Sequence, residues 1–365
     1  MVMHRVENKS FSFKSIKLTA IALSVSLIAA DVANAQSLGG FPIREPGASR
    51  PGGGGNAGGG GGQPSKKGPL QIIVDANGPG PYKSISQAID AVAEGGVVYV
   101  MHGRYNESIE LTKSVSIQGD RGPGPGVLIS APMNAACLKF DPEKATAHAV
   151  VANVQFESKI NSGAPACVDI KKGVFTLKES DVLGSGVRPA VKVSGGTVML
   201  EKNRVSAGSE GIMVEQTHSL SQSFIIDNKI LQNRIGVDIS SGSYADVVVA
   251  GNEIFDNLDN GIKSSGYGAT KFIGNKIRNN KGSGILLDKY AKLSLVRYNE
   301  IVQNNGDGVA VPFGVNGVIE DNDIVGNTGK AIYMREGLEP KVTNNIMKNN
   351  AGDHCSRRDR KKGRC

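Results

Sequence analysis

Hydrophobic and polar residues alternate along the second half of the chain in short segments that return at a nearly constant spacing. Seven of these segments begin with an asparagine followed two positions later by Val or Ile, and the asparagines are separated by 25, 24, 23, 24, 23 and 22 residues. They are Asn203, Asn228, Asn252, Asn275, Asn299, Asn322 and Asn344. A period this regular predicts a solenoid, in which each repeat packs on the next.

A second alternating segment opens with a small residue eight or nine positions after most of these asparagines. The small residues are Gly211, Gly236, Gly261, Gly284, Gly308 and Ala331. Both kinds of segment are rich in Ile and Val, and they are too short and too interrupted by Gly for helices. We therefore predict an all-β fold, a parallel β-helix with coils of about 23 residues whose strands lie about 4.8 Å apart.

The repeated asparagines suit such coils for two reasons. Asn tolerates the left-handed backbone region that a turn requires, and its amide is able to hydrogen-bond the asparagine of the next coil. The alternative fold is a β-sandwich with Asn in its turns, but a sandwich requires no constant repeat length.

The start of the folded region has a different pattern. We expect folded structure from Leu70, beginning with the strand Gln71-Ile-Ile-Val74. A capping-box pattern from Ser84 to Gln87 then precedes an apolar helical face that ends at Gly95-Gly96. This predicts a short amphipathic helix that covers the open end of the solenoid, where the first coil would otherwise expose its strand edges.

The alternation of Asn-x-Ile-x-x-Asn with Gly-Ile-x-Ile resembles two groups of known proteins. These are the right-handed parallel β-helix repeats of the pectate-lyase-like superfamily and the periplasmic β-helix proteins of the NosD type. The resemblance covers residues 70 to 351 and implies a right-handed parallel β-helix of roughly ten coils. The superfamily contains lyases, hydrolases, esterases, epimerases and members without activity, so the resemblance specifies a fold and not a reaction.

The passage Gly103-Arg-Tyr105-Asn-Glu107 resembles the Gly-x-Tyr-x-Glu element near the start of pectin methylesterases and related β-helix proteins. In those families the element is a structural turn shared by members with different chemistry. The esterase's catalytic stretches are missing, and the chain has no Trp. The polygalacturonase, pectate-lyase and mannuronan-epimerase signatures are also missing.

The N-terminus predicts export. Residues 1 to 35 combine basic residues, an apolar run from Leu18 to Ala30 and the motif Ala33-Asn34-Ala35, which together predict a secretory signal peptide of the Sec type with cleavage after Ala35. The apolar run is short for a membrane anchor. We expect a secreted or periplasmic protein that is not transmembrane after cleavage. Residues 36 to 69 then form a Gly-rich segment, predicted to be a disordered linker.

The formal net charge of +8 belongs mostly to the two ends of the chain. Residues 1 to 35 contribute +2 and residues 356 to 365 contribute +5, which leaves +1 for the remainder. A nearly neutral solenoid disfavours nucleic acid as a partner. The basic tail, residues 352 to 365, is the part expected to contact an anionic surface.

The four cysteines are Cys137, Cys167, Cys355 and Cys365, and none has the spacing of a metal site. In an oxidising compartment Cys355 and Cys365 are able to close a loop around the basic tail, and Cys137 and Cys167 to pair between neighbouring coils. Two buried free thiols are an equal alternative for the second pair.

Candidate catalytic residues come from the strand that follows each small residue. Its outward positions are Lys139, Asp169, Lys192, Met213, Asp238, Lys263, Leu286, Ala310 and Tyr333. Stacked coils would gather Asp238 and Lys263 with Glu215 and Asp288, one outward position further along their strands. Such a cluster suits a lyase, with Lys as base and Ca²⁺ held by carboxylates, or a hydrolase with an acid/base pair. The alternative is a ladder of charges that neutralise one another.

Candidate substrate-binding residues lie in the turn after that strand. Tyr244, Tyr267 and Tyr290 recur at intervals of 23 residues, and His218 falls near the same place one coil earlier. We expect the tyrosines to stack as a ladder on which sugar rings pack; a stack that only shields the turn is the alternative. Two outward residues of the strand, Lys192 and Tyr333, are further candidates.

These observations favour a protein that binds an acidic or neutral polysaccharide along the Gly-Ile-x-Ile face and has no recognisable catalytic motif. Ca²⁺ is expected only for a lyase, and no other cofactor or metal is predicted. The first alternative is a polysaccharide lyase or glycoside hydrolase that acts on a uronate polymer through the charged cluster. The second is a structural or protein-interaction solenoid at the cell surface.

Overall fold

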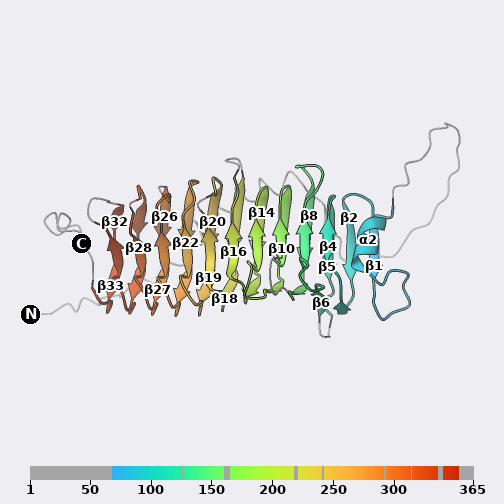
Figure 1. The fold of residues 1–365 in the computed structure, drawn as a ribbon, viewed down its shortest axis with the longest axis horizontal. Coiled ribbons are helices and arrows are strands. Elements are labelled where there is room, and N and C mark those ends of the chain that lie inside the picture. Colours follow the sequence, from blue (N-terminus) through green and yellow to red (C-terminus); the bar gives the residue numbers. More distant parts are fainter. Residues whose placement is uncertain are drawn as a thin grey trace, which may run out of the picture. The chain divides into compact units, whose positions relative to one another are not determined.

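The computed structural model describes residues 68–122, 124, 126–159, 165–217, 221–240, 242–291, 293–313, 315–335 and 340–352. The predicted signal peptide, the predicted linker up to residue 67, His218 and the tail from residue 353, with Cys355 and Cys365, lie outside these residues. The described part is a parallel β-solenoid of about 11 turns with three sheets and one short helix (Figure 1). The predicted fold class is confirmed.

The first sheet has twelve strands, which are hydrogen-bonded in chain order. They are β1 (Gln71–Val74), β2 (Gly96–Val100), β5 (Val115–Gly119), β8 (His148–Ala152), β11 (Val174–Lys178), β14 (Thr197–Glu201), β17 (Gln222–Ile226), β20 (Asp246–Ala250), β23 (Thr270–Ile273), β26 (Ser294–Arg297), β29 (Val318–Glu320) and β32 (Lys341–Thr343).

The second sheet has eleven strands, all short. They are β3 (Gly103–Tyr105), β6 (Val127–Ser130), β9 (Gln155–Glu157), β12 (Asp181–Leu183), β15 (Arg204–Ser206), β18 (Lys229–Leu231), β21 (Glu253–Phe255), β24 (Lys276–Arg278), β27 (Glu300–Val302), β30 (Asp323–Val325) and β33 (Ile346–Lys348).

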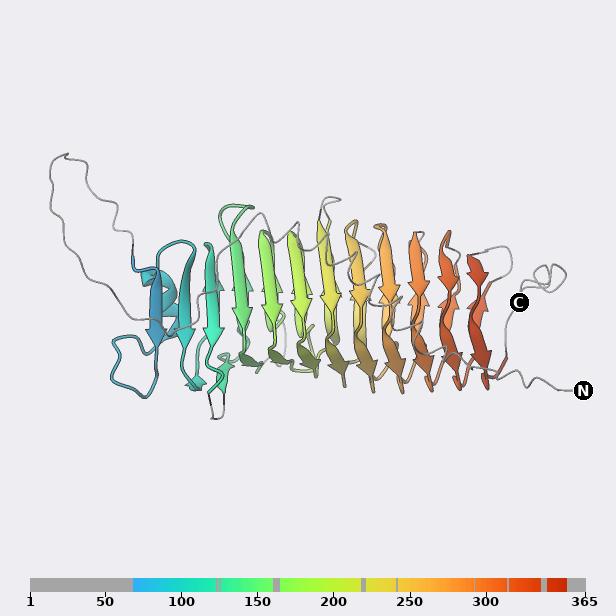
Figure 2. The same ribbon diagram turned by 180° about the vertical axis from the view of Figure 1, so that it is seen from behind.

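The third sheet has ten strands and contains the Gly-Ile-x-Ile segments. They are β4 (Ile109–Leu111), β7 (Leu138–Phe140), β10 (Val168–Ile170), β13 (Val191–Val193), β16 (Glu210–Val214), β19 (Ile235–Ile239), β22 (Ile262–Ser264), β25 (Ile285–Leu287), β28 (Val309–Val311) and β31 (Ile332–Met334). Every strand in the three sheets pairs in parallel with its counterpart one coil away, so that equivalent residues form straight columns along the stack (Figure 2). Inward positions such as Val237 and Ile239 are fully buried and form the core between the sheets.

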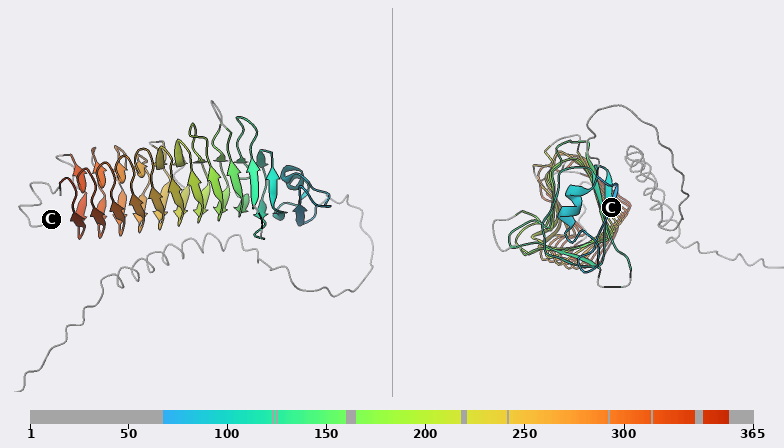
Figure 3. Two further views of the ribbon diagram at one scale, coloured as in Figure 1. Left: turned by 90° about the horizontal axis from the view of Figure 1, so that it is seen from below. Right: turned by 90° about the vertical axis from the view of Figure 1, so that its right-hand side faces the viewer.

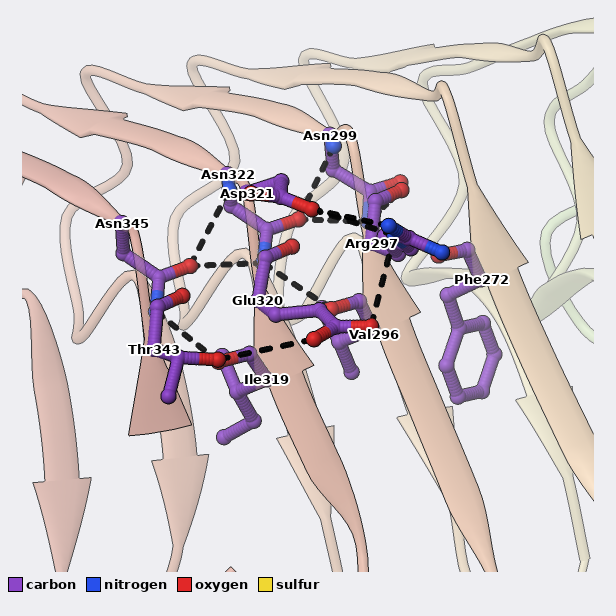
Figure 4. A network of polar contacts seen from close by, with 10 residues as sticks. All are labelled: Phe272, Val296, Arg297, Asn299, Ile319, Glu320, Asp321, Asn322, Thr343 and Asn345. Carbon is purple, nitrogen blue, oxygen red and sulfur yellow. Dashed lines mark hydrogen bonds and ion pairs between the residues drawn. The ribbon is translucent and has the colours of Figure 1, made fainter. Parts of the chain in front are cut away.

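The repeated asparagines form a continuous buried ladder. In each step the side-chain Nδ2 and the backbone N–H of one asparagine both donate to the Oδ1 of the next, as in Asn203 to Asn228 at 3.0 and 2.9 Å. The ladder runs on through Asn322, but its last member is Asn345 and not Asn344, which the repeat had predicted (Figure 4). In the same view Arg297 contacts the carboxylates of Glu320 and Asp321 on the next coil.

The left-handed conformation falls on the residue before each ladder asparagine. Lys202, Asp227 and Asn344 have φ of 54°, 54° and 56°, and Gly251 occupies the same position with φ of 67°. The expectation that the ladder asparagines themselves take this conformation was therefore wrong. Asn is needed at the ladder position because its amide satisfies buried backbone groups, and the preceding position makes the bend.

A second ladder runs parallel to the first, five residues further along each coil. Its members are Asn233, Asn257, Asn280, Asn304, Asn327 and Asn350. The small residues lie directly beside this ladder. A Cβ on Gly261 would lie 2.7 Å from Cγ2 of Ile277 and 2.8 Å from the carbonyl oxygen of Gly284, so a larger residue does not fit at this position unless its neighbours shift.

The helix α2 (Ile85–Ala91) lies across the N-terminal end of the stack, as predicted (Figure 3). Its N-cap is Ser84, which accepts a hydrogen bond from the N–H of Gln87. The carboxylate of Glu107, from the Gly-x-Tyr-x-Glu element, accepts from the N–H groups of Ile85 and Ser86 at 2.8 and 2.9 Å. The element thus anchors the helix N-terminus, where a negative charge is favourable.

The pairing of Cys137 and Cys167 is settled by a disulfide, with Cα atoms 4.7 Å apart, that joins the starts of β7 and β10. The alternative of two free thiols is wrong.

Candidate functional site

The outward column on the third sheet has the register that the sequence predicts. Asp169 pairs with Lys139 and Lys192, Met213 with Lys192 and Asp238, and Lys263 with Asp238 and Leu286. Ala310 and Tyr333 continue it on β28 and β31. We call this set of residues the central column. Its neighbours on the same coils lie two residues further along, and include Glu215, Ser240, Ser265 and Asp288.

Charges in the N-terminal half of this face are paired. Lys139 contacts Glu110 at 2.9 Å, Lys171 contacts Asp169 at 2.9 Å, and Lys192 contacts Glu215 at 2.8 Å. Here the interpretation as a ladder of neutralising charges describes the surface well. The Lys192 pair also takes Glu215 out of the predicted four-residue cluster, since its carboxylate already has a cation.

The pairing stops at β19. Among the described residues neither Asp238 nor Lys263 has an ion-pair partner within 4 Å, although the two occupy adjacent positions in the register. Asp238 is 7% exposed, and its Oδ1 atom is buried without a hydrogen-bond partner in the described part of the chain. Burial raises the pKa of Asp238 to about 6, while the nearby Lys263 ammonium opposes this rise.

Asp288 connects the central column to the tyrosines. Its Oδ2 accepts a hydrogen bond from Ser265 at 3.4 Å. Its charge contributes to the raised pKa of Asp238 and also acts on Tyr290, so it lies near both. Asp238, Lys263 and Asp288 therefore share one region of the face, without direct contacts between their charged groups.

The three tyrosines form the expected ladder in the turns after β19, β22 and β25. The rings of Tyr244 and Tyr267 stack at 4.8 Å between centroids with 10° between planes, and those of Tyr267 and Tyr290 at 4.5 Å with 28°. The Lys289 ammonium lies 5.2 Å from the Tyr290 ring centroid and is the main cause that lowers the pKa of Tyr290. Tyr244 and Tyr267 remain 48% and 40% exposed.

Stacking changes what the ladder offers to a ligand. Because the ring faces lie against one another, Tyr267 presents its edge and hydroxyl, and the two end members, Tyr244 and Tyr290, each have one face turned away from the stack. The ladder is therefore a row of phenol hydroxyls with an outer aromatic face at each end, and the Lys289 ammonium lies near the Tyr290 ring.

The other predicted binding residues lie elsewhere. Lys192 lies three coils before Lys263 and is paired with Glu215. Tyr333 lies two coils after Leu286 in the central column, with the Lys330 ammonium 5.2 Å from its ring centroid. Sequence reasoning missed Ser240 and Ser265, the small polar residues between the charged groups and the ladder. Their place in the sequence could have identified them, because each is the next outward position after Asp238 or Lys263.

A pocket of about 330 Å³ lies away from this face. It is lined by residues around β6, β9 and β12, among them Asp120, Arg121, Asn153 and Glu179. None of the predicted site residues lines it.

Two family models match the chain. The right handed beta helix region matches residues 263–360, and the periplasmic copper-binding protein (NosD) matches residues 184–306. Neither match spans half of the chain. Among the described residues, no group of three or more His, Cys, Asp or Glu side chains is able to hold a metal ion.

Several solved structures have the same fold. The A-module of the Azotobacter vinelandii mannuronan C-5 epimerase AlgE4 has a TM-score of 0.54 at 15% identity, with 74% of this chain and 91% of that chain covered. The periplasmic alginate epimerase AlgG gives 0.52 at 15% identity, with 75% and 69% covered. ORF18 of Geobacillus virus E2 gives 0.54 at 13% identity, with 78% and 62% covered. No curated protein matches the sequence.

The repeat, the three parallel sheets and the family-model matches define the class of protein. The chain is a right-handed parallel β-helix repeat protein. Within that class its coils are similar to the NosD repeats over residues 184–306, the part that carries the tyrosine ladder. No helix of the described chain is long and apolar enough to cross a membrane.

Proposed function

We propose that the protein binds a polysaccharide along the outward face of the third sheet, centred on Asp238, Lys263 and the tyrosine ladder. One observation carries this proposal: the charges of the face are paired up to β16 and unpaired at β19 and β22, beside the exposed tyrosines. Unpaired polar groups beside aromatic rings are the surface that a polyhydroxylated ligand requires. Two solved structures of this fold are named for enzymes of mannuronan and alginate, which are polysaccharides.

Binding is tested by calorimetric titration of the protein with a panel of neutral and acidic polysaccharides. Tyr267→Ala is expected to weaken binding roughly two- to tenfold, since it removes a phenol hydroxyl, and a hydrogen bond contributes about 0.5–1.5 kcal/mol. Tyr99→Ala, on β2 and away from the ladder, is the matched control and should bind like the wild type. Equal affinities for the two variants would contradict the proposal.

A second candidate function is cleavage of a uronate polymer by a lyase or hydrolase. The observation in its favour is Asp238, whose pKa of about 6 suits a general acid or base near neutral pH. Against it, Glu215 is already paired with Lys192, and Lys263 is not within 4 Å of a described carboxylate. Incubation with polyuronate and Ca²⁺ would reveal unsaturated products by their absorbance, or new reducing ends. Neither signal is expected from a binder.

We also propose a secreted or periplasmic location, with residues 1–35 as the signal peptide, residues 36–69 as a tether and the basic tail as a contact for an anionic surface. Support comes from the charge and apolar pattern of the N-terminus and from the similarity to the periplasmic NosD repeats. N-terminal sequencing of the exported protein should find Gln36 as the first residue. Retention of residues 1–35 would contradict the location.

A further inference from the structure

Four charged groups without an ion-pair partner in the described chain lie near the tyrosine ladder. They are the carboxylates of Asp238 and Asp288 and the ammonium groups of Lys263 and Lys289. Together they have no net formal charge. Of the charges beyond them, Glu215 is paired with Lys192, and Arg234 contacts two carboxylates, Glu210 and Asp259, so these groups add no positive charge. This part of the face therefore has no excess of positive charge for an anionic polymer to neutralise.

Asp238 is an acceptor that lacks a donor. It holds an outward position between Met213 and Lys263, so it points away from the core, yet it is 7% exposed and its Oδ1 has no hydrogen bond with a described residue. A buried carboxylate oxygen without a donor is unfavourable. A ligand that brings hydroxyl hydrogens to the exposed part of this carboxylate supplies a donor to it, and a ligand that brings another carboxylate is repelled by it.

The groups around Asp238 suit a hydroxyl ligand in the same way. Ser240 Oγ is also buried without a hydrogen-bond partner in the described chain, and Ser265 and the tyrosine hydroxyls are able both to donate and to accept. A sugar hydroxyl likewise donates and accepts hydrogen bonds. The carboxylate of an ionised uronate only accepts, and the two lysines that would bind it already lie next to Asp238 and Asp288.

We propose that this site selects a neutral, hydroxyl-rich glycan over a polyuronate, and that Asp238 sets the preference. The inference rests on the proposed function and adds the class of polysaccharide. Like charges brought close across an interface suppress the wrong partner, and here the repelled partner is the polymer that carries a carboxylate on each sugar.

The test compares the affinities of a neutral β-glucan and a polyuronate by calorimetry, at neutral pH and constant ionic strength. The wild type is expected to bind the neutral glucan at least about tenfold more tightly. Asp238→Asn should reduce that ratio about fivefold or more. Asp169→Asn is the matched control: Asp169 is in the same column, 4% exposed and also has an Oδ1 without a partner in the described chain, but its Oδ2 is paired with Lys171 at 2.9 Å and it lies three coils from Asp238. Its variant should keep the wild-type ratio.

A second variant, Asp288→Asn, keeps the test decisive if Asp238→Asn folds poorly. It removes one negative charge and should increase the affinity for polyuronate by a few-fold. If the polyuronate binds as tightly as the neutral glucan and depends on Tyr267, the preference is overturned while the proposed function stands. If neither polymer binds, both the proposed function and the preference for a neutral glycan are overturned. An equal ratio for Asp238→Asn and Asp169→Asn overturns the role of Asp238.

Discussion

The Oδ1 atom of Asn275 accepts two hydrogen bonds from Asn252 of the preceding coil, one from the side-chain Nδ2 and one from the backbone N–H, both at 3.0 Å. Both residues are fully buried. Asn275→Leu leaves the buried backbone N–H of Asn252 without an acceptor, while the Asn252 side chain keeps the carbonyl oxygens of Ile225 and Ala250, and we expect the free energy of unfolding to fall by about 2–4 kcal/mol. Urea denaturation measures the loss. Asn305→Ala, at an exposed position of the next coil, should change the free energy of unfolding by less than about 0.5 kcal/mol.

The glycine column predicts a steric effect of a single methyl group. A Cβ at position 261 would be too close to Ile277 and to the Gly284 backbone, so Gly261→Ala should destabilise the protein by about 1–3 kcal/mol. Gly80→Ala adds the same methyl group where nothing lies within 4 Å and should have little effect. Similar melting temperatures for the two variants would contradict this prediction, because they would show that the residues around Gly261 move to accommodate the methyl group.

The anchoring of α2 by Glu107 predicts a local change. Glu107→Ala removes the acceptor for the N–H groups of Ile85 and Ser86, and we expect a loss of about 1–2 kcal/mol in the stability of this end. Hydrogen exchange should become faster in α2 and stay unchanged in β19. Asp90→Asn, at an exposed position of the same helix, is the control, and it should leave the exchange of α2 as in the wild type.

Asp238 predicts a pH dependence of stability. Its pKa of about 6 in the folded protein lies above the ordinary value of 3.8, so the folded state binds the proton more tightly than the unfolded state. Its contribution to stability is therefore full below about pH 4 and is lost as the pH rises through about 6. At pH 7.5 the free energy of unfolding of Asp238→Asn should be about 1–3 kcal/mol higher than that of the wild type. At about pH 4 the two free energies should be nearly equal. Urea denaturation measures both. An equal difference at both pH values would contradict the raised pKa.

The fold was predictable because the period of the repeat is itself the physical cause of the stacking. Coils of equal length place equivalent residues in columns, which is why the register of the central column and the stack of Tyr244, Tyr267 and Tyr290 followed from spacing alone. The error at Asn344 has a local cause. Two asparagines stand in sequence there, and the pattern could not show which one turns inward and which one makes the bend.

The site was less predictable, because charged side chains are long and choose among several partners. Column positions predicted that Glu215, Asp238, Lys263 and Asp288 share a region, but not that Lys192 would take Glu215. The column positions also did not predict how deeply Asp238 is buried. Asp238 is a short side chain between the longer Met213 and Lys263, and its low exposure depends on that packing.

The two asparagine ladders have a consequence for how the molecule changes in size. Each asparagine contacts only the adjacent coils, so a complete coil added or removed beyond Asn299 would restore the same set of partners at the new junction. The length of the solenoid can therefore change by gain or loss of whole coils, while the surface around Asp238 stays the same.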